Sequence, residues 1–200
     1  MNQTGTNRIA PSNGVLVEGR LIVAAPGWHD DRLGRTVCYV VHHGPQGSVG
    51  VVLNRCVGPS VAKAIDWLID GRSDSRRLNQ LYVGGPSAGP LVAIHDNVSH
   101  AEFQVGDGLC FTASLGKLRD LLAESSEGAN LKLVIGQVGW KAGQLDTQLR
   151  QGNWYVLPAD PRIVFAEHDQ MWRRAMRQVG DYYLAMITGC RGVPRRPDYN

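Results

Sequence analysis

Residues 131–158 read LKLVIGQVGWKAGQLDTQLRQGNWYVLP, and this stretch decides the fold. Leu131–Val138 is rich in apolar and β-branched residues, so it predicts a buried strand. Gln144–Gln151 predicts a short helix, because its two leucines are four residues apart and share one face. Trp154–Leu157 predicts a second strand after a Gly-Asn break. Together these pieces form one compact unit of strand, turn, helix and returning strand.

The remaining strands and helices surround that unit along the chain. Strands are predicted at 20–25, 35–43, 48–54, 80–83, 91–95 and 109–112. Helices are predicted at 59–70, 114–122 and 168–179. The turns HGPQG and GGPSAG predict two hairpins, one between 35–43 and 48–54 and one between 80–83 and 91–95. Because strands dominate the first half and helices lie between the later strands, the pattern predicts one α+β domain with a mixed sheet.

The strand at 35–43 is expected to lie near the centre of that sheet. Both of its faces are mostly apolar, which is typical of a strand covered on two sides. Side chains alternate along a strand, so His42 is expected on the same face as Cys38 and Val40.

The two ends of the chain differ in composition from the domain between them. Residues 1–18 are mainly polar and are predicted to be a disordered tail, 19–189 one domain, and 190–200 a basic tail. The net charge of +3 arises wholly within 161–200, where there are seven arginines and four acids, since 1–160 carry fourteen charges of each sign. Such an excess is too small for a phosphate-binding face, so direct nucleic-acid binding is not expected.

The cysteines and the hydropathy pattern predict the compartment. Cys38, Cys56, Cys110 and Cys190 form no CxxC pair, and the polar N-terminus carries no apolar leader segment. No run approaches the ~18 apolar residues that span a bilayer. We therefore expect a cytoplasmic protein with reduced thiols that does not associate with a membrane.

The chain carries no established catalytic signature. There is no GxSxG, GxxxxGK[ST], HExxH or strand-linked GxGxxG motif. His43 and His95 could be imagined as metal ligands with Asp30 or Asp96, but a metal site needs three or four converging ligands. A histidine that bonds backbone or water at a strand end is the more common arrangement. We therefore predict neither a metal nor a cofactor.

Two side chains could act as nucleophiles, and one tryptophan could line a site. Cys56 follows Arg55, a cation of the kind that lowers a thiol pKa, but a small apolar core residue is the favoured interpretation. Ser87 lies in a Gly-rich turn that could hold an anion, although a wide turn between strands is favoured. Trp140 stands beside Gly139, which leaves room for a large ring, so it is predicted to pack in the core rather than line a groove.

Several short motifs follow one another along the chain. They are LIVAAP (21–26), HGPQGSVGVVLN (43–54), GGP (84–86), Ile94-His95, GQVGWKAGQLDTQL (136–149), Trp154 and Trp172. In this order, over 19–189, they resemble the AlgH/YqgE family of bacterial proteins. The resemblance implies a bent mixed sheet that closes into a partial barrel with helices outside. Members are often described as transcriptional regulators, and no agreed catalytic residues follow from the family. Ser48 stands where the family usually has a small apolar residue.

Three functional hypotheses stay open. The first is a cytoplasmic regulatory or interaction protein without catalytic activity, which binds an unknown protein or small molecule in a groove at strand ends and turns. That groove would be built from His43, Asn54, Gly84, Gly85, Pro86, His95, Gly139, Trp140 and Gln144. The second is a small hydrolytic or thiol-dependent enzyme that pairs His43 or His95 with Ser87 or Cys56. The third is a direct DNA-binding regulator, which the neutral first 160 residues and the lack of a helix-turn-helix argue against.

Overall fold

The computed structural model describes residues 16–58, 60, 81–105, 108–125 and 129–188. Their strands are β1 (Arg20–Ala24), β2 (Val37–Gly44), β3 (Gly47–Val52), β4 (Leu81–Val83), β5 (Ser87–His95), β6 (Phe103–Val105), β7 (Leu109–Thr112), β8 (Leu131–Lys141) and β9 (Trp154–Pro158). Their helices are η2 (Val98–His100), α2 (Leu115–Glu124), α3 (Gln144–Arg150), α4 (Pro161–Val164) and α5 (His168–Thr188). In the described part of the chain, no helix is long and apolar enough to cross a membrane.

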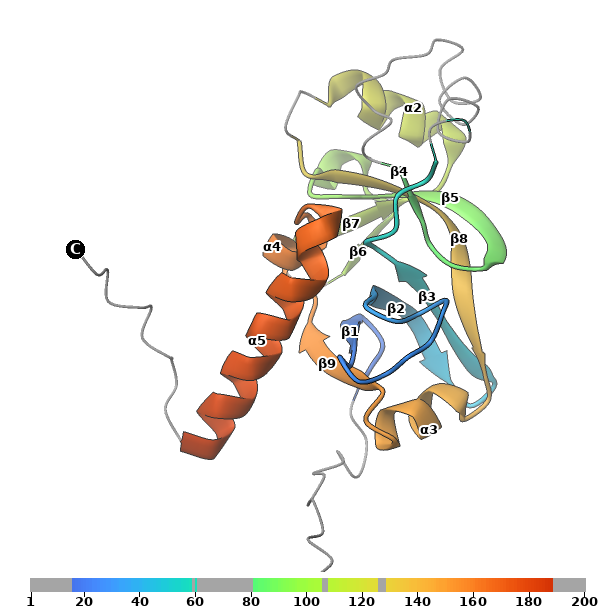
Figure 1. The fold of residues 1–200 in the computed structure, drawn as a ribbon. Helices are drawn as coiled ribbons and strands as arrows, with labels where there is room; N and C mark the ends of the chain where they lie inside the picture. The colour runs from blue at the N-terminus through green and yellow to red at the C-terminus, as the bar shows by residue number, and fades with distance from the viewer. Residues whose placement is uncertain (1–15, 59, 61–80, 106–107, 126–128, 189–200) are drawn as a thin grey trace, which may run out of the picture.

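The strands form one curled mixed sheet with helices outside it (Figure 1). Its strand order is β6-β7-β5-β8-β3-β2-β1-β9, with β4 paired to β8 off this path. The β4–β8 pair is parallel, and the other strand pairs are antiparallel. This architecture confirms the predicted α+β class with a bent sheet that closes into a partial barrel.

Strand β8 joins the two halves of the sheet. Its first part pairs with β5 and β4, and its last part, from Val138 to Lys141, pairs with β3. Gly136, with φ of +82°, lies where the partner changes. A Cβ on Gly84 would lie 2.2 Å from the carbonyl oxygen of Gly136, so only glycine lets these two backbones approach. The glycines at this point allow β8 to bend and the neighbouring backbones to pack closely.

Three apolar clusters fill the space between the sheet and its helices. One lies between the sheet and α5, and its helix residues include Met171, Ala175 and Val179. A second lies beneath α2 and includes Leu118 and Leu122. The third gathers Cys38, Val40, Val138, Trp140, Leu145 and Trp154 beneath α3. The predicted helix after Ser114 is confirmed with Ser114 at its N-cap, but the Ser114 side chain makes no capping hydrogen bond. Glu102 accepts hydrogen bonds from the backbone N–H groups of Ala113 and Ser114, just before the helix.

Some element boundaries differ from the sequence-based prediction. Helix α5 continues to Thr188, nine residues beyond its predicted end at 179, since the added segment contains the good helix formers Leu184, Ala185 and Met186. The predicted hairpin between 80–83 and 91–95 is wrong: β4 and β5 both pair with β8, and β5 already begins at Ser87. Strand β8 extends three residues beyond Val138 and contains Gly139 and Trp140.

Other predictions concern segments near the ends and the first helix. The helix predicted at 59–70 falls almost wholly outside the described residues, as do 1–15 and 189–200. Residues 16–18 were predicted to belong to the disordered tail. Here they are placed against the domain, because Val17 is only 2% exposed and the Glu18 carboxylate accepts a hydrogen bond from the backbone N–H of His43.

Candidate functional site

A corner of the sheet brings together side chains from three elements. The β2–β3 hairpin places His43 opposite Ser48, and Ser48 in turn lies opposite Trp140 on β8. The pairing of β2 with β3 shifts register between Val40 and His42. That irregularity brings His43, rather than His42, onto the face that carries Cys38 and Val40, because one extra residue reverses the alternation. The expected facing of His42 is therefore wrong.

The three polar side chains of this corner form a chain of contacts. His43 Nδ1 lies 2.7 Å from Ser48 Oγ, and His43 Nε2 lies 3.4 Å from Asp146 Oδ1 on α3. Ser48 is 4% exposed, whereas the side chains of His43 and Asp146 are 21% and 42% exposed. A buried hydroxyl is thus linked through an imidazole to a carboxylate near solvent.

A second carboxylate, that of Glu18, contacts both His42 and His43. The backbone N–H of His43 donates to Glu18 Oε2 at 2.9 Å, and His42 Nδ1 lies 3.1 Å from the same oxygen. The hydrogen bond from the His43 backbone is the main reason that the pKa of Glu18 is lowered. Glu18 therefore stays ionised at neutral pH and ties the segment before β1 to the hairpin.

Helix α3 is positioned by the turn that precedes it. Gly143 has φ of +69°, a left-handed conformation that favours glycine, and it stands at the helix N-cap. Gln144 Oε1 accepts a hydrogen bond of 2.9 Å from the backbone N–H of Lys141, which closes the turn. This tight connection holds Asp146 above the hairpin. Gln144, predicted as a groove residue, contributes here to the geometry of the turn.

Trp140 forms the floor of the corner rather than an open wall. It is 4% exposed, and its Nε1 donates to Gln148 Oε1 at 3.0 Å. Trp154 Nε1 donates to the same oxygen at 2.9 Å, so one amide holds both indoles. The prediction that Trp140 packs in the core is confirmed. Gly139 is its neighbour on β8, pairs with Val49, and has open space where a side chain would lie.

The other predicted groove residues lie elsewhere. Asn54 accepts a hydrogen bond from the backbone N–H of Val37 at 3.0 Å and donates to the carbonyl of Arg35 at 3.0 Å. These bonds hold Arg35 at φ of +56°, the one positive φ outside glycine among the described residues. Asn54 thus stabilises the entry into β2.

The Gly84–Pro86 turn packs against β8 instead of cradling an anion. The N–H of Gly84 donates to the carbonyl of Ile135 at 2.8 Å, and its carbonyl accepts from the N–H of Val52 at 2.7 Å. A Cβ on Gly85 would lie 2.3 Å from the backbone of Gln137. Both glycines are required by close backbone contact, and the N–H of Gly84 is already engaged.

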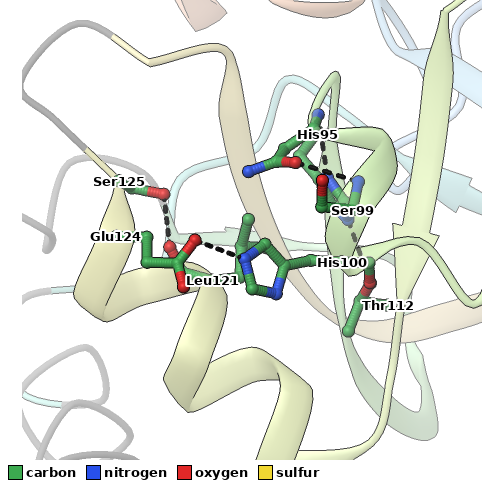
Figure 2. Close-up of polar contacts among 8 residues, drawn as sticks. His95, Ser99, His100, Thr112, Leu121, Glu124 and Ser125 are labelled. Atoms are coloured by element: carbon green, nitrogen blue, oxygen red, sulfur yellow. Dashed lines mark hydrogen bonds and ion pairs between the residues drawn. The ribbon is translucent and has the colours of Figure 1, made fainter.

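His95 belongs to a separate polar network at the far end of β8 (Figure 2). It is 1% exposed, and its Nδ1 accepts from the backbone N–H of Asn97 at 3.2 Å. Its Nε2 therefore donates to Thr112 Oγ1 at 3.0 Å, and that hydroxyl donates to the carbonyl of His100 at 2.5 Å. Desolvation by burial lowers the pKa of His95, so the neutral ring is favoured.

The second histidine of that network pairs with a helix. His100 Nε2 lies 2.7 Å from Glu124 Oε2, which links η2 to the end of α2 (Figure 2). His95 pairs with Leu131, at the opposite end of β8 from Trp140. Leu131 and Trp140 are nine positions apart along β8, which corresponds to roughly 30 Å of extended strand. The structure therefore brings His43, Gly139, Trp140 and Gln144 to one corner and places His95 in another region.

The predicted nucleophiles are not paired with the predicted histidines. Ser87 is exposed at the start of β5, opposite Gln137. Cys56 has an exposed thiol whose pKa is raised, chiefly by desolvation, so it is less reactive than an ordinary cysteine. Among the residues that the structure describes, no group of three or more His, Cys, Asp or Glu side chains could hold a metal ion.

Lys132 is a buried polar residue that sequence reasoning missed. It is 3% exposed, its Nζ donates to the carbonyl of Ala166 at 3.2 Å, and it lies 3.9 Å from the centroid of the Tyr82 ring. Desolvation lowers its pKa to about 8. The one sign of this residue's role in the sequence is a lysine inside an otherwise apolar strand. Through its hydrogen bond to Ala166, the Lys132 side chain ties β8 to the turn between α4 and α5.

Comparison with known proteins identifies the chain's relatives. A family described as AlgH-like matches residues 21–184. A UPF0301 protein of Nitrobacter hamburgensis is 34% identical over 86% of this chain and 84% of its own length. A UPF0301 protein of Afipia carboxidovorans is 30% identical over 92% of this chain and 93% of its own.

Solved structures support the same relationship. The solution structure of the AlgH protein from Pseudomonas aeruginosa aligns with a TM-score of 0.66 at 26% identity, covering 97% of this chain and all of that one. The crystal structure of protein DIP2367 from Corynebacterium diphtheriae aligns with a TM-score of 0.63 at 23% identity, covering 82% of this chain and 88% of that one, and supports the fold alone. None of these names assigns a reaction.

Proposed function

The chain belongs to the AlgH-like family, and we propose that it is a cytoplasmic interaction protein that docks a protein partner on the exposed end of α5. A regulatory role, of the kind that the family resemblance implies, would be exerted through that partner. The observation that carries the proposal is an apolar helix face that continues beyond the sheet on which the helix packs.

The first half of α5 uses an apolar face to cover the sheet. Met171, Ala175 and Val179 are buried at helical spacing, and the Nε1 of Trp172 donates to the carbonyl of Ala24 at 2.8 Å. Figure 1 shows the helix running on past β9 and away from the sheet. The buried half therefore anchors the helix to the sheet.

The same face of the projecting half is largely exposed, although Tyr183 still packs edge to face on Tyr155 of β9, with ring centroids 5.9 Å apart. Counted at 100° per residue, the side chains that continue this stripe are Tyr182, Tyr183, Met186 and Ile187. Their exposed fractions are 55%, 39%, 61% and 80%. Contiguous exposed apolar side chains of this kind are typical of a surface that another molecule covers.

The chemistry of the partner follows from charge and from the composition of the chain's own ends. Residues 189–200, GCRGVPRRPDYN, carry few large apolar side chains. All of the net charge of +3 lies within 161–200. The expected occupant is thus a segment of a partner protein with apolar side chains along one face and acidic residues beside them, which the net positive charge of residues 161–200 attracts.

Fluorescence anisotropy with a synthetic peptide tests this proposal. The probe is an amphipathic helical peptide of leucine and glutamate, and its control is the leucine and lysine counterpart. We expect the acidic peptide to bind better than the basic one and Ile187→Asp to weaken it about 10-fold, near 1.4 kcal/mol. Val98→Asp, at an exposed position of 60% on η2, should leave binding unchanged.

Four outcomes would overturn the proposal. Equal binding to the wild type and Ile187→Asp would remove α5 from the interaction. Light scattering that shows a dimer dissolved by Ile187→Asp would make a second copy of the chain the occupant. Binding to phosphatidylglycerol vesicles, with none to the acidic peptide, would make the surface a membrane contact. Sequence-specific DNA binding at physiological salt would replace the protein partner by DNA.

A further inference from the structure

The corner beneath α3 contains the parts of a nucleophilic site. Ser48 Oγ lies 2.7 Å from His43 Nδ1, and His43 Nε2 lies 3.4 Å from Asp146 Oδ1. A hydroxyl is a weak nucleophile on its own and becomes effective when an adjacent base can take its proton. A third group that orients the base completes the arrangement found in Ser-His-Asp enzymes. The α5 surface plays no part in this.

We propose that Ser48 is a nucleophile that is acylated by small carboxylic esters, with His43 as its base and Asp146 as a positioning residue. In the tautomer with the proton on Nε2, the ring turns its N–H toward the Asp146 carboxylate, 3.4 Å away, and presents the Nδ1 lone pair to the serine hydroxyl. The carboxylate favours this tautomer and stabilises the imidazolium that forms when the ring takes the proton.

The reaction has two balanced steps. Ser48 Oγ bonds to the ester carbonyl carbon while its proton passes to His43 Nδ1. The bond between that carbon and the alkoxy oxygen then breaks, and the leaving alkoxide takes the proton from the imidazolium. A water molecule next attacks the acyl-serine, transfers a proton to His43, and releases the carboxylic acid. Ser48 regains its proton from the imidazolium, so ester and water become acid and alcohol.

The surroundings limit both substrate size and rate. Ser48 is 4% exposed, and the His43 side chain that contacts it is 21% exposed, so we expect only short acyl groups to reach the hydroxyl. Strand β3 is paired on both sides, with β2 and with β8, which engages its backbone N–H groups in the sheet. Without an oxyanion hole from that strand, general-base catalysis alone contributes about 10²–10⁴-fold. We expect a slow esterase.

Labelling with diisopropyl fluorophosphate tests the proposal before any natural ester is known. Ser48 Oγ would attack phosphorus, fluoride would leave, and peptide mass spectrometry would locate the adduct. Ser87 is an internal control, because it is an exposed serine on β5 that lies opposite Gln137. Ser48 should be labelled at least about 10²-fold faster than Ser87, the lower bound for general-base assistance.

Variants separate catalysis from a structural hydrogen bond. Ser48→Ala should abolish the adduct and p-nitrophenyl acetate hydrolysis while keeping the urea midpoint close to that of the wild type. His43→Gln should reduce labelling to the rate of Ser87. Asp146→Asn should slow the labelling of Ser48, and Asp146→Glu should restore its rate. In the wild type the labelling rate should fall at low pH, because a protonated imidazole cannot take the serine proton.

Two results would overturn this assignment. One is a native protein whose Ser48 is labelled no faster than Ser87. The other is labelling of Ser48 that is unaffected by His43→Gln in a variant whose unfolding midpoint matches the wild type, because the histidine would then bond the serine without activating it.

Discussion

Truncating Trp140 tests how the corner is built. The side chain is 4% exposed, so Trp140→Ala removes almost all of its buried surface. A buried aromatic covers about 150–250 Å². At about 25 cal/mol per Å² this area corresponds to about 4–6 kcal/mol of transfer free energy. Alanine retains part of that surface, and measured truncations of this kind cost about 3–5 kcal/mol. We therefore expect a loss of about 4 kcal/mol, a large part of an ordinary domain's stability.

The hydrogen bonds around Trp140 determine which second variant serves as the control. Gln148 Oε1 keeps its bond from Trp154 Nε1 at 2.9 Å when Trp140 is removed, so no buried acceptor is left unpaired. Trp140→Phe keeps a ring in the same place and should cost only about 1–2 kcal/mol. Urea unfolding followed by circular dichroism measures both variants by linear extrapolation. A loss below about 1.5 kcal/mol for Trp140→Ala would refute the core role.

Three further predictions concern thiols, a buried amine and a close backbone contact. All four cysteines should titrate as free thiols after anaerobic purification and unfolding, whereas in the native protein Cys56 should react before the buried Cys38; two or fewer thiols would contradict this. Burial lowers the pKa of Lys132 from 10.5 to about 8, so the folded state binds fewer protons than the unfolded state between these values. Stability should therefore rise with pH across that window, by at most about 3 kcal/mol, and Lys132→Met should abolish the rise in urea midpoints. Gly84→Ala should cost about 3 kcal/mol or more, because its Cβ would meet the carbonyl of Gly136 at 2.2 Å, while Gly139→Ala, with open space around it, should unfold near the wild-type midpoint.

Local patterns in the sequence were enough to predict much of the architecture. Apolar and β-branched runs located the strands, and the HGPQG turn predicted the hairpin that the structure confirms. The spacing of apolar residues located α3 and the first half of α5. These predictions hold because strand alternation, helix periodicity and turn chemistry are properties of a few neighbouring residues. The core position predicted for Trp140 is correct, but the reason differs: Gly139 faces open space, and the glycine that leaves room for the ring is Gly50 on β3.

Contacts between distant segments depended on the tertiary structure. Nothing local shows that β4 and β5 both pair with β8, since strand pairing is decided by the register of residues far apart in the chain. The irregularity after Val40 changes which histidine faces α3, and so it decides that His43 meets Ser48 and Asp146. The sequence determined which residues could carry chemistry. Only the folded chain determined which of them meet, because convergence requires the bend of β8, the hairpin register and the turn before α3 together.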